Sequence, residues 1–221
     1  AAGTIGSELV KRVIKFSPSK IILVDRSENN LVMLEHEINS KYLDQVEDID
    51  LITLIVDISN YNSVSKLLKN YKPEIILHAA AHKHVNLMEK TPAEAVRNNI
   101  GGIINLANNA IKENVEKFVL VSSDKAVEPS SVMGSTKRIS EKILSQMKDT
   151  KNTKFTSVRF GNVLGSDGSV VPIFQKQIEQ GGPVTVTDQN VERFFMTAHE
   201  AAGLILSAAE FGKNKEIFLL D

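Results

Sequence analysis

Short apolar runs rich in β-branched residues recur through the first three quarters of the chain. Each run is five or six residues long and apolar almost throughout, rather than alternating with polar residues. This pattern is typical of strands that are buried on both faces of a parallel sheet. The predicted strands are Lys20–Val24, Leu51–Val56, Glu74–Ala79, Lys117–Val121 and Phe155–Arg159.

Apolar residues with helical spacing fill the segments between these runs. Leu9, Val10 and Ile14 mark the first helix, and longer stripes follow over Ala95–Ala107 and Ile139–Met147. Strands that alternate with helices in this way indicate an α/β fold with a doubly wound parallel sheet of the Rossmann type. The first strand of such a sheet is missing from the chain, so we expect this chain to be part of a longer protein.

The rhythm changes after Arg159, where glycines crowd a segment with many loops. We predict helices at about residues 172–180 and 197–211, and we expect Phe194 and Phe195 to belong to a core. Residues 1–160 are therefore interpreted as the main domain. Residues 161–221 are interpreted as a smaller substrate-binding lobe, interleaved with the main domain over the carboxyl edge of the sheet and, like the main domain, truncated at its chain end.

The chain opens with half of a glycine-rich motif, AAGTIGSEL. Gly3 and Gly6 match the last two glycines of G-x-x-G-x-x-G, whose first glycine would fall before Ala1. Such a loop lets backbone N–H groups at a helix N-terminus approach a pyrophosphate. An ordinary glycine turn before a helix would look the same. We expect Gly3, Thr4, Ile5 and Gly6 to contact a dinucleotide.

Two aspartates end the next two predicted strands. Asp25 follows Gly6 by 19 positions, which is close to the spacing at which a carboxylate holds the adenosine ribose. A turn aspartate at a strand end is the alternative. Arg26 could hold a 2′-phosphate, so the choice between NAD and NADP stays open. Asp57, with Ile58, is expected at the adenine, although Asp57 could instead cap a helix.

The segment after the Lys117–Val121 strand reads SSDKAVEPSSVMGSTKR, residues 122–138. The end of a strand in a doubly wound sheet faces the ligand crevice. Adjacent acid and base side chains, here Asp124 and Lys125, can shift each other's pKa and divide the roles of acid and base. Spacing alone is equally compatible with a surface ion pair beside a turn.

At this point the chain resembles the nucleotide-sugar 4,6-dehydratases of the extended short-chain dehydrogenase/reductase superfamily. It is most similar to the UDP-N-acetylglucosamine 4,6-dehydratases of polysaccharide biosynthesis. The resemblance covers essentially the whole chain, in the motifs GTIGSEL, HAAAHKHV, NNIGG, SSDKA, MGSTKR, RFGNVLGSDGSVVPIF and RFFMT. It implies a lyase with a tightly bound NAD or NADP that is recycled in each turnover.

The reaction implied by the resemblance is an internal redox dehydration of UDP-N-acetylglucosamine. C4 of the hexose is oxidised, C5 loses a proton, the C6 hydroxyl leaves as water, and a hydride returns to C6. The product is a UDP-4-keto-6-deoxy-N-acetylhexosamine for surface polysaccharide or glycan synthesis.

The resemblance also assigns catalytic roles. Ser123 binds the sugar 4-hydroxyl, Asp124 protonates the departing 6-hydroxyl, Lys125 takes the C5 proton and Lys137 holds the nicotinamide ribose. Met133 stands at the position of the superfamily tyrosine.

Met133 leaves the base for oxidation at C4 undefined. In Tyr-x-x-x-Lys the lysine charge lowers the phenol pKa, so that the tyrosine accepts the proton; a thioether does not. With Met133 at this position, the chain resembles a subgroup of long, membrane-anchored dehydratases. This resemblance favours retention of configuration at C5. We hypothesise that Asp124 or Lys125 accepts this proton, directly or through water and Ser123.

Further positions match cofactor-binding and substrate-binding segments of the family. For the cofactor these are Ala79, Ala80, Ala81 and Asn99, and for the sugar nucleotide they are Lys83, Asn162, Ser166, Val171, Pro183, Thr185 and Arg193. Three of these matches have plain structural alternatives: the alanines suit tight strand–helix packing, Asn99 suits a helix position bonded to backbone, and Arg193 suits an ion pair. His82 and His84 lack the partners of a metal site, and none is predicted.

The composition of the chain excludes several classes of protein, but it does not indicate which reaction is catalysed. The absence of cysteine excludes disulfides and thiolate metal sites, and a net charge of -1 argues against nucleic acid as a partner. No apolar run in the chain reaches the roughly 18 residues of a membrane span. We expect a cytoplasmic enzyme, or the cytoplasmic domain of a membrane-anchored parent.

Two other functions stay open. A nucleotide-sugar 4-epimerase would use the same scaffold without an elimination acid, and a non-catalytic NAD(P)-binding regulatory module would need no base. The apolar stripes over residues 92–112 and 133–147 predict a homo-oligomer, although a core would use them equally well.

Overall fold

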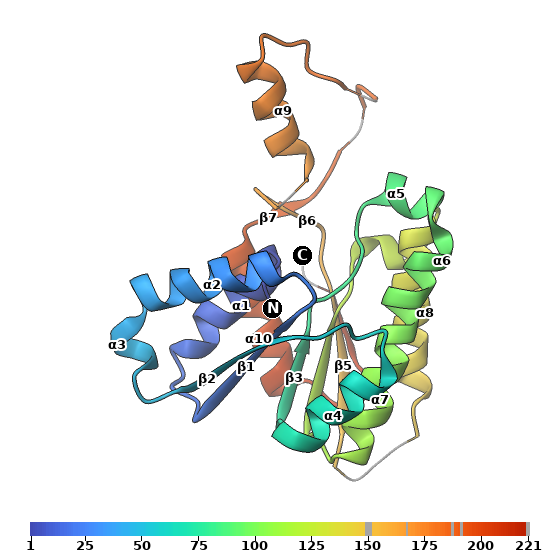
Figure 1. The fold of residues 1–221 in the computed structure, drawn as a ribbon. Helices are drawn as coiled ribbons and strands as arrows, with labels where there is room; N and C mark the ends of the chain where they lie inside the picture. Colours follow the sequence, from blue (N-terminus) through green and yellow to red (C-terminus); the bar gives the residue numbers. More distant parts are fainter. Residues whose placement is uncertain (149–151, 167, 187, 191, 220–221) are drawn as a thin grey trace.

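The computed structural model describes residues 1–148, 152–166, 168–186, 188–190 and 192–219. A parallel sheet in two parts lies between layers of helices (Figure 1). One part pairs β1 (Lys20–Asp25) with β2 (Asp50–Ile55). The other has the order β3 (Ile75–His78), β4 (Lys117–Val121), β5 (Lys154–Arg159) and β8 (Ile217–Leu219). The α/β fold is confirmed, and the five predicted strands agree with the structure to within one residue at each end.

Helices cover both faces of the four-stranded part and bury two separate cores. On one face α4 (Tyr61–Tyr71), α7 (Gly102–Lys112) and α8 (Val132–Gln146) pack on β4 and β5 around Phe118 and Phe155, whose ring centroids lie 5.6 Å apart. On the other face α1 (Thr4–Ile14) and α10 (Ala198–Phe211) form the second core. The central strands β4 and β5 are buried because both of their faces meet a helix layer.

A third core belongs to the two-stranded part of the sheet. There α1 and β1 pack against α2 (Glu28–Lys41) and α3 (Leu43–Val46). Ser27 caps α2 and Asn60 caps α4 through side-chain oxygens. Asp57 therefore does not cap α4. Its carboxylate accepts a hydrogen bond from Ser59 N and lies near Arg97 instead.

The long stripe predicted over Ala95–Ala107 is not one regular helix. After α5 (Val85–Lys90) and α6 (Pro92–Ala95) the chain forms a π-helix, η1 (Val96–Gly101), before it continues as α7. The wider turn buries two consecutive polar residues, Asn98 and Asn99. π-helical turns are rare and occur frequently at functional sites.

The glycine-rich segment after β5 carries one helix away from the sheet. The short parallel pair β6 (Asn162–Val163) and β7 (Phe195–Met196) leads to α9 (Val170–Glu179), which has no buried residue and stands apart from the main body (Figure 1). Helix α10 and strand β8 then return to the sheet. The boundary at residue 160 stays a prediction.

The expectation of a core around Phe194 and Phe195 was wrong. Phe194 is 91% exposed and Phe195 is 43% exposed. The β6–β7 ladder joins only two residue pairs, so it offers too little surface to bury an aromatic ring. Within the described residues, no helix is both long and apolar enough to cross a membrane.

Candidate active site

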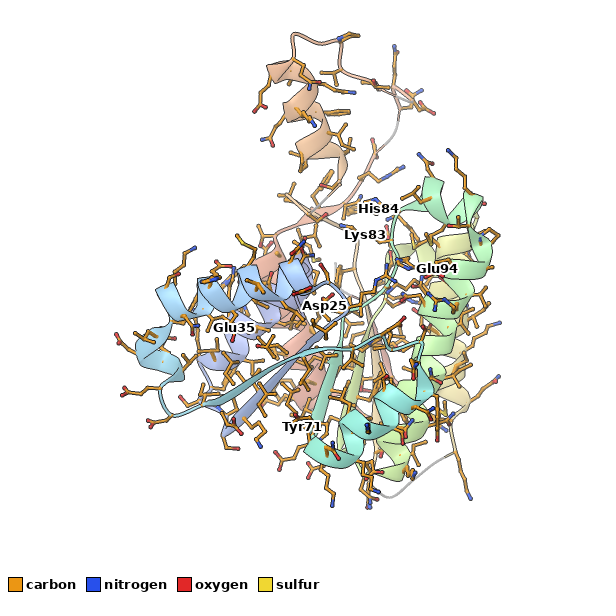
Figure 2. The ribbon with its side chains drawn as sticks, viewed as in Figure 1. Asp25, Glu35, Tyr71, Lys83, His84 and Glu94 are labelled. Carbon is orange, nitrogen blue, oxygen red and sulfur yellow. The ribbon has the colours of Figure 1, made fainter. Side chains whose placement is uncertain are left out.

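A cavity of about 670 Å³ opens at the carboxyl ends of the strands. Its lining includes residues at the carboxyl ends of β1, β2, β3 and β4, and this edge is where ligands bind in doubly wound sheets. Figure 2 shows Asp25 and Glu94 on the two sides of this region, with Lys83 and His84 above them. The cavity lining includes these predicted site residues: Gly3, Thr4, Ile5, Gly6, Asp25, Arg26, Asp57, Ile58, Ala79, Ala80, Ala81, Lys83, Ser123, Lys125, Met133, Lys137, Asn162 and Ser166.

The N-terminus of α1 faces the cavity without a side-chain cap. Gly3 is the N-cap residue, and it makes no side-chain cap hydrogen bond. A Cβ placed on Gly3 would meet nothing within 4 Å, so the space in front of the helix is open. Backbone N–H groups at the positive end of a helix favour an anion such as a pyrophosphate.

Asp25 is fixed beside this helix by backbone donors. Its Oδ1 accepts from Ser27 N at 3.0 Å and its Oδ2 accepts from Ala2 N at 2.9 Å. The carboxylate therefore stays at the strand end with acceptor capacity left for a ribose hydroxyl.

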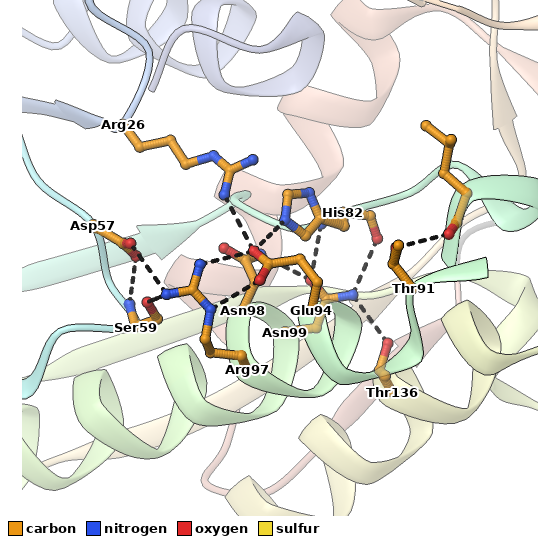
Figure 3. A network of polar contacts seen from close by, with 11 residues as sticks. Arg26, Asp57, Ser59, His82, Thr91, Glu94, Arg97, Asn98, Asn99 and Thr136 are labelled. Atoms are coloured by element: carbon orange, nitrogen blue, oxygen red, sulfur yellow. Dashed lines mark hydrogen bonds and ion pairs between the residues drawn. The ribbon is translucent and has the colours of Figure 1, made fainter. Parts of the chain in front are cut away.

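A polar network across the cavity involves two residues that sequence reasoning missed, Glu94 and Arg97 (Figure 3). Arg97 binds Glu94 through two hydrogen bonds of 2.9 Å and approaches Asp57 at 3.9 Å. Arg26 lies 3.8 Å from Glu94. The hydrogen bonds from Arg97 lower the pKa of Glu94 to about 2, so this carboxylate is ionised.

The same network holds His82, the first residue after the three alanines. Its Nε2 lies 3.4 Å from Glu94. No group of three or more ionisable metal ligands occurs among the residues that the structure describes.

Asn99 holds the backbone of a cavity-lining residue, His82, by hydrogen bonds. Its Oδ1 accepts from His82 N at 2.8 Å, and its Nδ2 donates to His82 O at 3.0 Å and to Thr136 Oγ1 at 3.0 Å. Asn99 therefore clamps the backbone after β3 and does not line the cavity. Asn98, its neighbour on the π-helix, lines the cavity instead.

Ser123, Asp124 and Lys125 form a hydrogen-bonded cluster at the end of β4. Asp124 Oδ1 accepts from Ser123 Oγ at 2.7 Å, from Lys125 N at 2.8 Å and from Lys125 Nζ at 3.0 Å. Lys125 Nζ also donates to Asn162 Oδ1 at 3.3 Å. Asp124 adjoins the cavity through these partners rather than lining it.

The electrostatics of the cluster favour an ionised Asp124. Partial burial raises its pKa, but hydrogen bonds from Ser123 and Lys125 and the lysine charge outweigh burial, so the pKa lies below its ordinary value. An ionised carboxylate can accept a proton, as a weaker base when its pKa is lowered, and it donates one only after it has taken one up.

Helix α8 brings Met133 and Lys137 to the opposite wall. Lys137 is buried and its Nζ donates to Val121 O at 2.7 Å. Burial lowers its pKa to about 8, against the raising effect of Glu141. Burial also lowers the pKa of His78 to about 3, so this histidine at the end of β3 is neutral.

The pKa of Lys137 predicts how stability changes with pH. Between pH 8 and the ordinary lysine value of 10.5, the unfolded chain binds a proton that the folded chain does not. The free energy of unfolding should therefore gain up to about 3 kcal/mol from Lys137 as the pH rises through this window. Urea unfolding at a series of pH values from 7.5 to 10.5 measures this change in the free energy of unfolding.

Lys137→Met should remove this rise, whereas Lys142→Met, at an exposed position on the same helix, should keep it. A rise that persists unchanged in Lys137→Met would contradict the assignment.

The predicted substrate residues divide into two groups. Lys83, Asn162 and Ser166 line the cavity. Val171, Pro183, Thr185 and Arg193 lie outside its lining, on α9 and the segment after it. Arg193 Nη1 donates to Glu192 O at 2.7 Å, a backbone hydrogen bond in place of the ion pair considered from the sequence.

Comparison with known proteins identifies a protein family and several relatives that are similar to this chain. The family model described as "Polysaccharide biosynthesis protein" matches residues 1–221. The capsular polysaccharide biosynthesis protein CapD of Staphylococcus aureus is 47% identical over 222 residues, which is 100% of this chain and 37% of CapD. The chain thus spans little more than a third of this curated relative. UDP-glucose 4-epimerases also occur among the relatives.

Solved structures agree with the fold. Pen from Bacillus thuringiensis superposes with a TM-score of 0.92 at 38% identity, over 100% of this chain and 66% of Pen. A double mutant of the dTDP-glucose 4,6-dehydratase DesIV from Streptomyces venezuelae, with NAD bound, has a TM-score of 0.84 at 19% identity, over 99% of this chain and 72% of DesIV. Since the family model matches every residue of the chain, this protein belongs to the polysaccharide biosynthesis protein family.

Proposed function

We propose that this protein is an NAD(P)-dependent dehydratase of a nucleotide sugar, and specifically of UDP-N-acetylglucosamine. The observation that carries the proposal is the Ser123–Asp124–Lys125 cluster beside a cavity with an uncapped helix N-terminus and a buried lysine on its walls. An acid and a base in contact are what an elimination needs, and a simple transfer of hydride at C4 does not need both.

The residues present suit a dinucleotide. The α1 N-terminus would hold its pyrophosphate, Asp25 or Arg26 its adenosine ribose, and Asp57 and Ile58 its adenine. Lys137 would hold the nicotinamide ribose. When bound, the cofactor would accept a hydride from C4 of the sugar and return it to C6.

The chain's own residues would move the protons. Ionised Asp124 accepts the proton of the C4 hydroxyl, directly or through Ser123, and later gives it to the C6 hydroxyl as that group leaves as water. Lys125, whose Nζ contacts Asp124, would release its ammonium proton to water and, as the neutral amine, take the C5 proton. It would return that proton to C5 after the hydride reaches C6, and regain its own proton from water.

The product mass tests this function. The full-length protein is incubated with UDP-N-acetylglucosamine and NAD or NADP, and mass spectrometry follows the nucleotide sugar. Loss of one water is expected. An unchanged mass with a new sugar would identify a 4-epimerase, and an unchanged substrate would indicate a binding module.

Two substitutions test the role of Asp124 at C4. Asp124→Asn should slow oxidation at C4 by about 10²-fold or more, because the amide cannot accept the proton. Met133→Tyr should restore part of this rate, since it supplies a phenol four residues before Lys137. Full C4 oxidation in Asp124→Asn, with no gain from Met133→Tyr, would overturn the assignment.

We also propose that two copies of the protein associate through α7 and α8, as the apolar stripes predict. Val96, Ile104 and Ile139 are between 38% and 49% exposed on these helices and η1, which is surface that a partner helix pair would cover.

A further inference from the structure

A carboxylate outside the proposed reaction lies buried behind the catalytic segment. Glu141 on α8 is 2% exposed. It accepts from Ser122 Oγ at 2.5 Å, from Arg159 Nε at 2.8 Å and from Arg159 Nη2 at 2.6 Å. Arg138 Nη1 lies 3.8 Å from it. Both of its oxygens are therefore satisfied, and its charge is matched by a guanidinium that is itself only 13% exposed.

Glu141 and its two hydrogen-bond partners, Ser122 and Arg159, come from three segments that adjoin the proposed catalytic groups. Glu141 follows Lys137 by one helical turn on α8. Ser122 directly precedes Ser123. Arg159 ends β5 and leads into the backbone that binds the catalytic segment: Asp124 N donates to Phe160 O at 3.1 Å, and Asn162 accepts from Lys125 Nζ.

Burying an ion pair is costly, and apolar residues of similar size often give equal or better stability. An ion pair that joins these three segments therefore calls for a reason other than stability. Its geometry supplies one, because a bidentate carboxylate–guanidinium pair fixes orientation as well as distance.

We propose that Glu141 is a positioning residue of this site: through Ser122 and Arg159 it fixes the Ser123–Lys125 segment and the 160–162 backbone against the helix that carries Lys137. The proposal rests on the function proposed above. It also predicts an effect on cofactor binding, since Lys137 shares the helix and one turn with Glu141.

The test compares two variants with the wild-type protein. The triple variant Ser122→Ala, Glu141→Leu, Arg159→Met removes the buried ion pair together with its Ser122 contact. It leaves Arg138, whose side chain is 39% exposed, in contact with water. It should melt near the wild-type temperature, yet have a kcat about 100-fold lower, as expected for catalytic groups that are misplaced by about 1 Å. Its NAD dissociation constant should rise about tenfold.

The single variant Ser122→Ala keeps the ion pair and removes only its link to the catalytic segment, so it tests the proposal even if the triple variant does not fold. It should keep the melting temperature and lower kcat with little change in KM. The double variant Ser122→Ala, Glu141→Gln is compared with the two single variants. The losses of kcat caused by Ser122→Ala and by Glu141→Gln should not add, because both substitutions act through the contact between Ser122 and Glu141.

Each outcome has one meaning. If wild-type protein removes no water from the substrate, the proposed function fails, and NAD binding by the variants still decides the role of Glu141. If Ser122→Ala keeps wild-type kcat and NAD affinity, and the folded triple variant does too, the cluster is a plain ion pair and the positioning role is overturned.

Discussion

Lys125→Met is expected to lower kcat for dehydration by about 10²–10⁴-fold, which is the usual contribution of a general base. The methionine keeps the length and apolar stem of the side chain but cannot take the C5 proton. It also removes the hydrogen bond to Asp124 at 3.0 Å and the one to Asn162 at 3.3 Å. The pKa of Asp124 should rise as a result, since the lysine charge is one of the influences that lower it.

The measurement separates this step from binding. Exchange of the C5 hydrogen with deuterated water should vanish in Lys125→Met, while the affinity for NAD stays near the wild-type value. Lys142→Met, which removes an exposed lysine from α8, serves as the control and should leave both unchanged. Undiminished C5 exchange in Lys125→Met would show that another group is the base.

Gly134→Ala is expected to cause the second large loss, because a single methyl group would enter the space of the catalytic backbone. A Cβ on Gly134 would lie 2.5 Å from the carbonyl oxygen of Lys125 and 3.3 Å from both Pro129 Cβ and Ser131 Oγ. A backbone carbonyl cannot swing aside as a side chain end can. The segment that carries Asp124 and Lys125 must therefore move, and a displacement near 1 Å lowers kcat by about 10²-fold.

The matched control is Gly101→Ala, another glycine in a helical segment. Its nearest obstacle would be Val96 O at 3.9 Å, an ordinary contact, so alanine should be neutral or stabilise the protein by up to about 1 kcal/mol. Steady-state kinetics and melting temperatures of the two variants are compared. If Gly134→Ala retains wild-type kcat, the close approach has no catalytic importance.

Fold class and strand positions were predictable because buried parallel strands leave a strong mark in the sequence. Lys117–Val121 is apolar at every position after the first, and this strand was predicted without error. The π-helix was not predictable, because its apolar spacing reads as ordinary helix until Asn98 and Asn99 are seen to be buried together.

The candidate site was predictable where a motif concentrates its chemistry in one segment, as in residues 122–138. The contributions of Glu94, Arg97 and Glu141 were missed because each depends on a partner distant in sequence or on a helix face. Two signals were available: Glu94 and Arg97 are three residues apart on one helical stretch, and Arg159 is a charge at the end of a buried strand. Neither signal identifies its partner.

Helix α1 belongs to two of the cores described above. Leu9 packs with α10 in one core, while Val10 and Ile14 pack with β1 and α2 in another. A dinucleotide bound at the N-terminus of α1 would therefore stabilise the helix that joins these two cores. Amide exchange in α10, which contributes no residue to the cavity lining, should then slow as the cofactor binds.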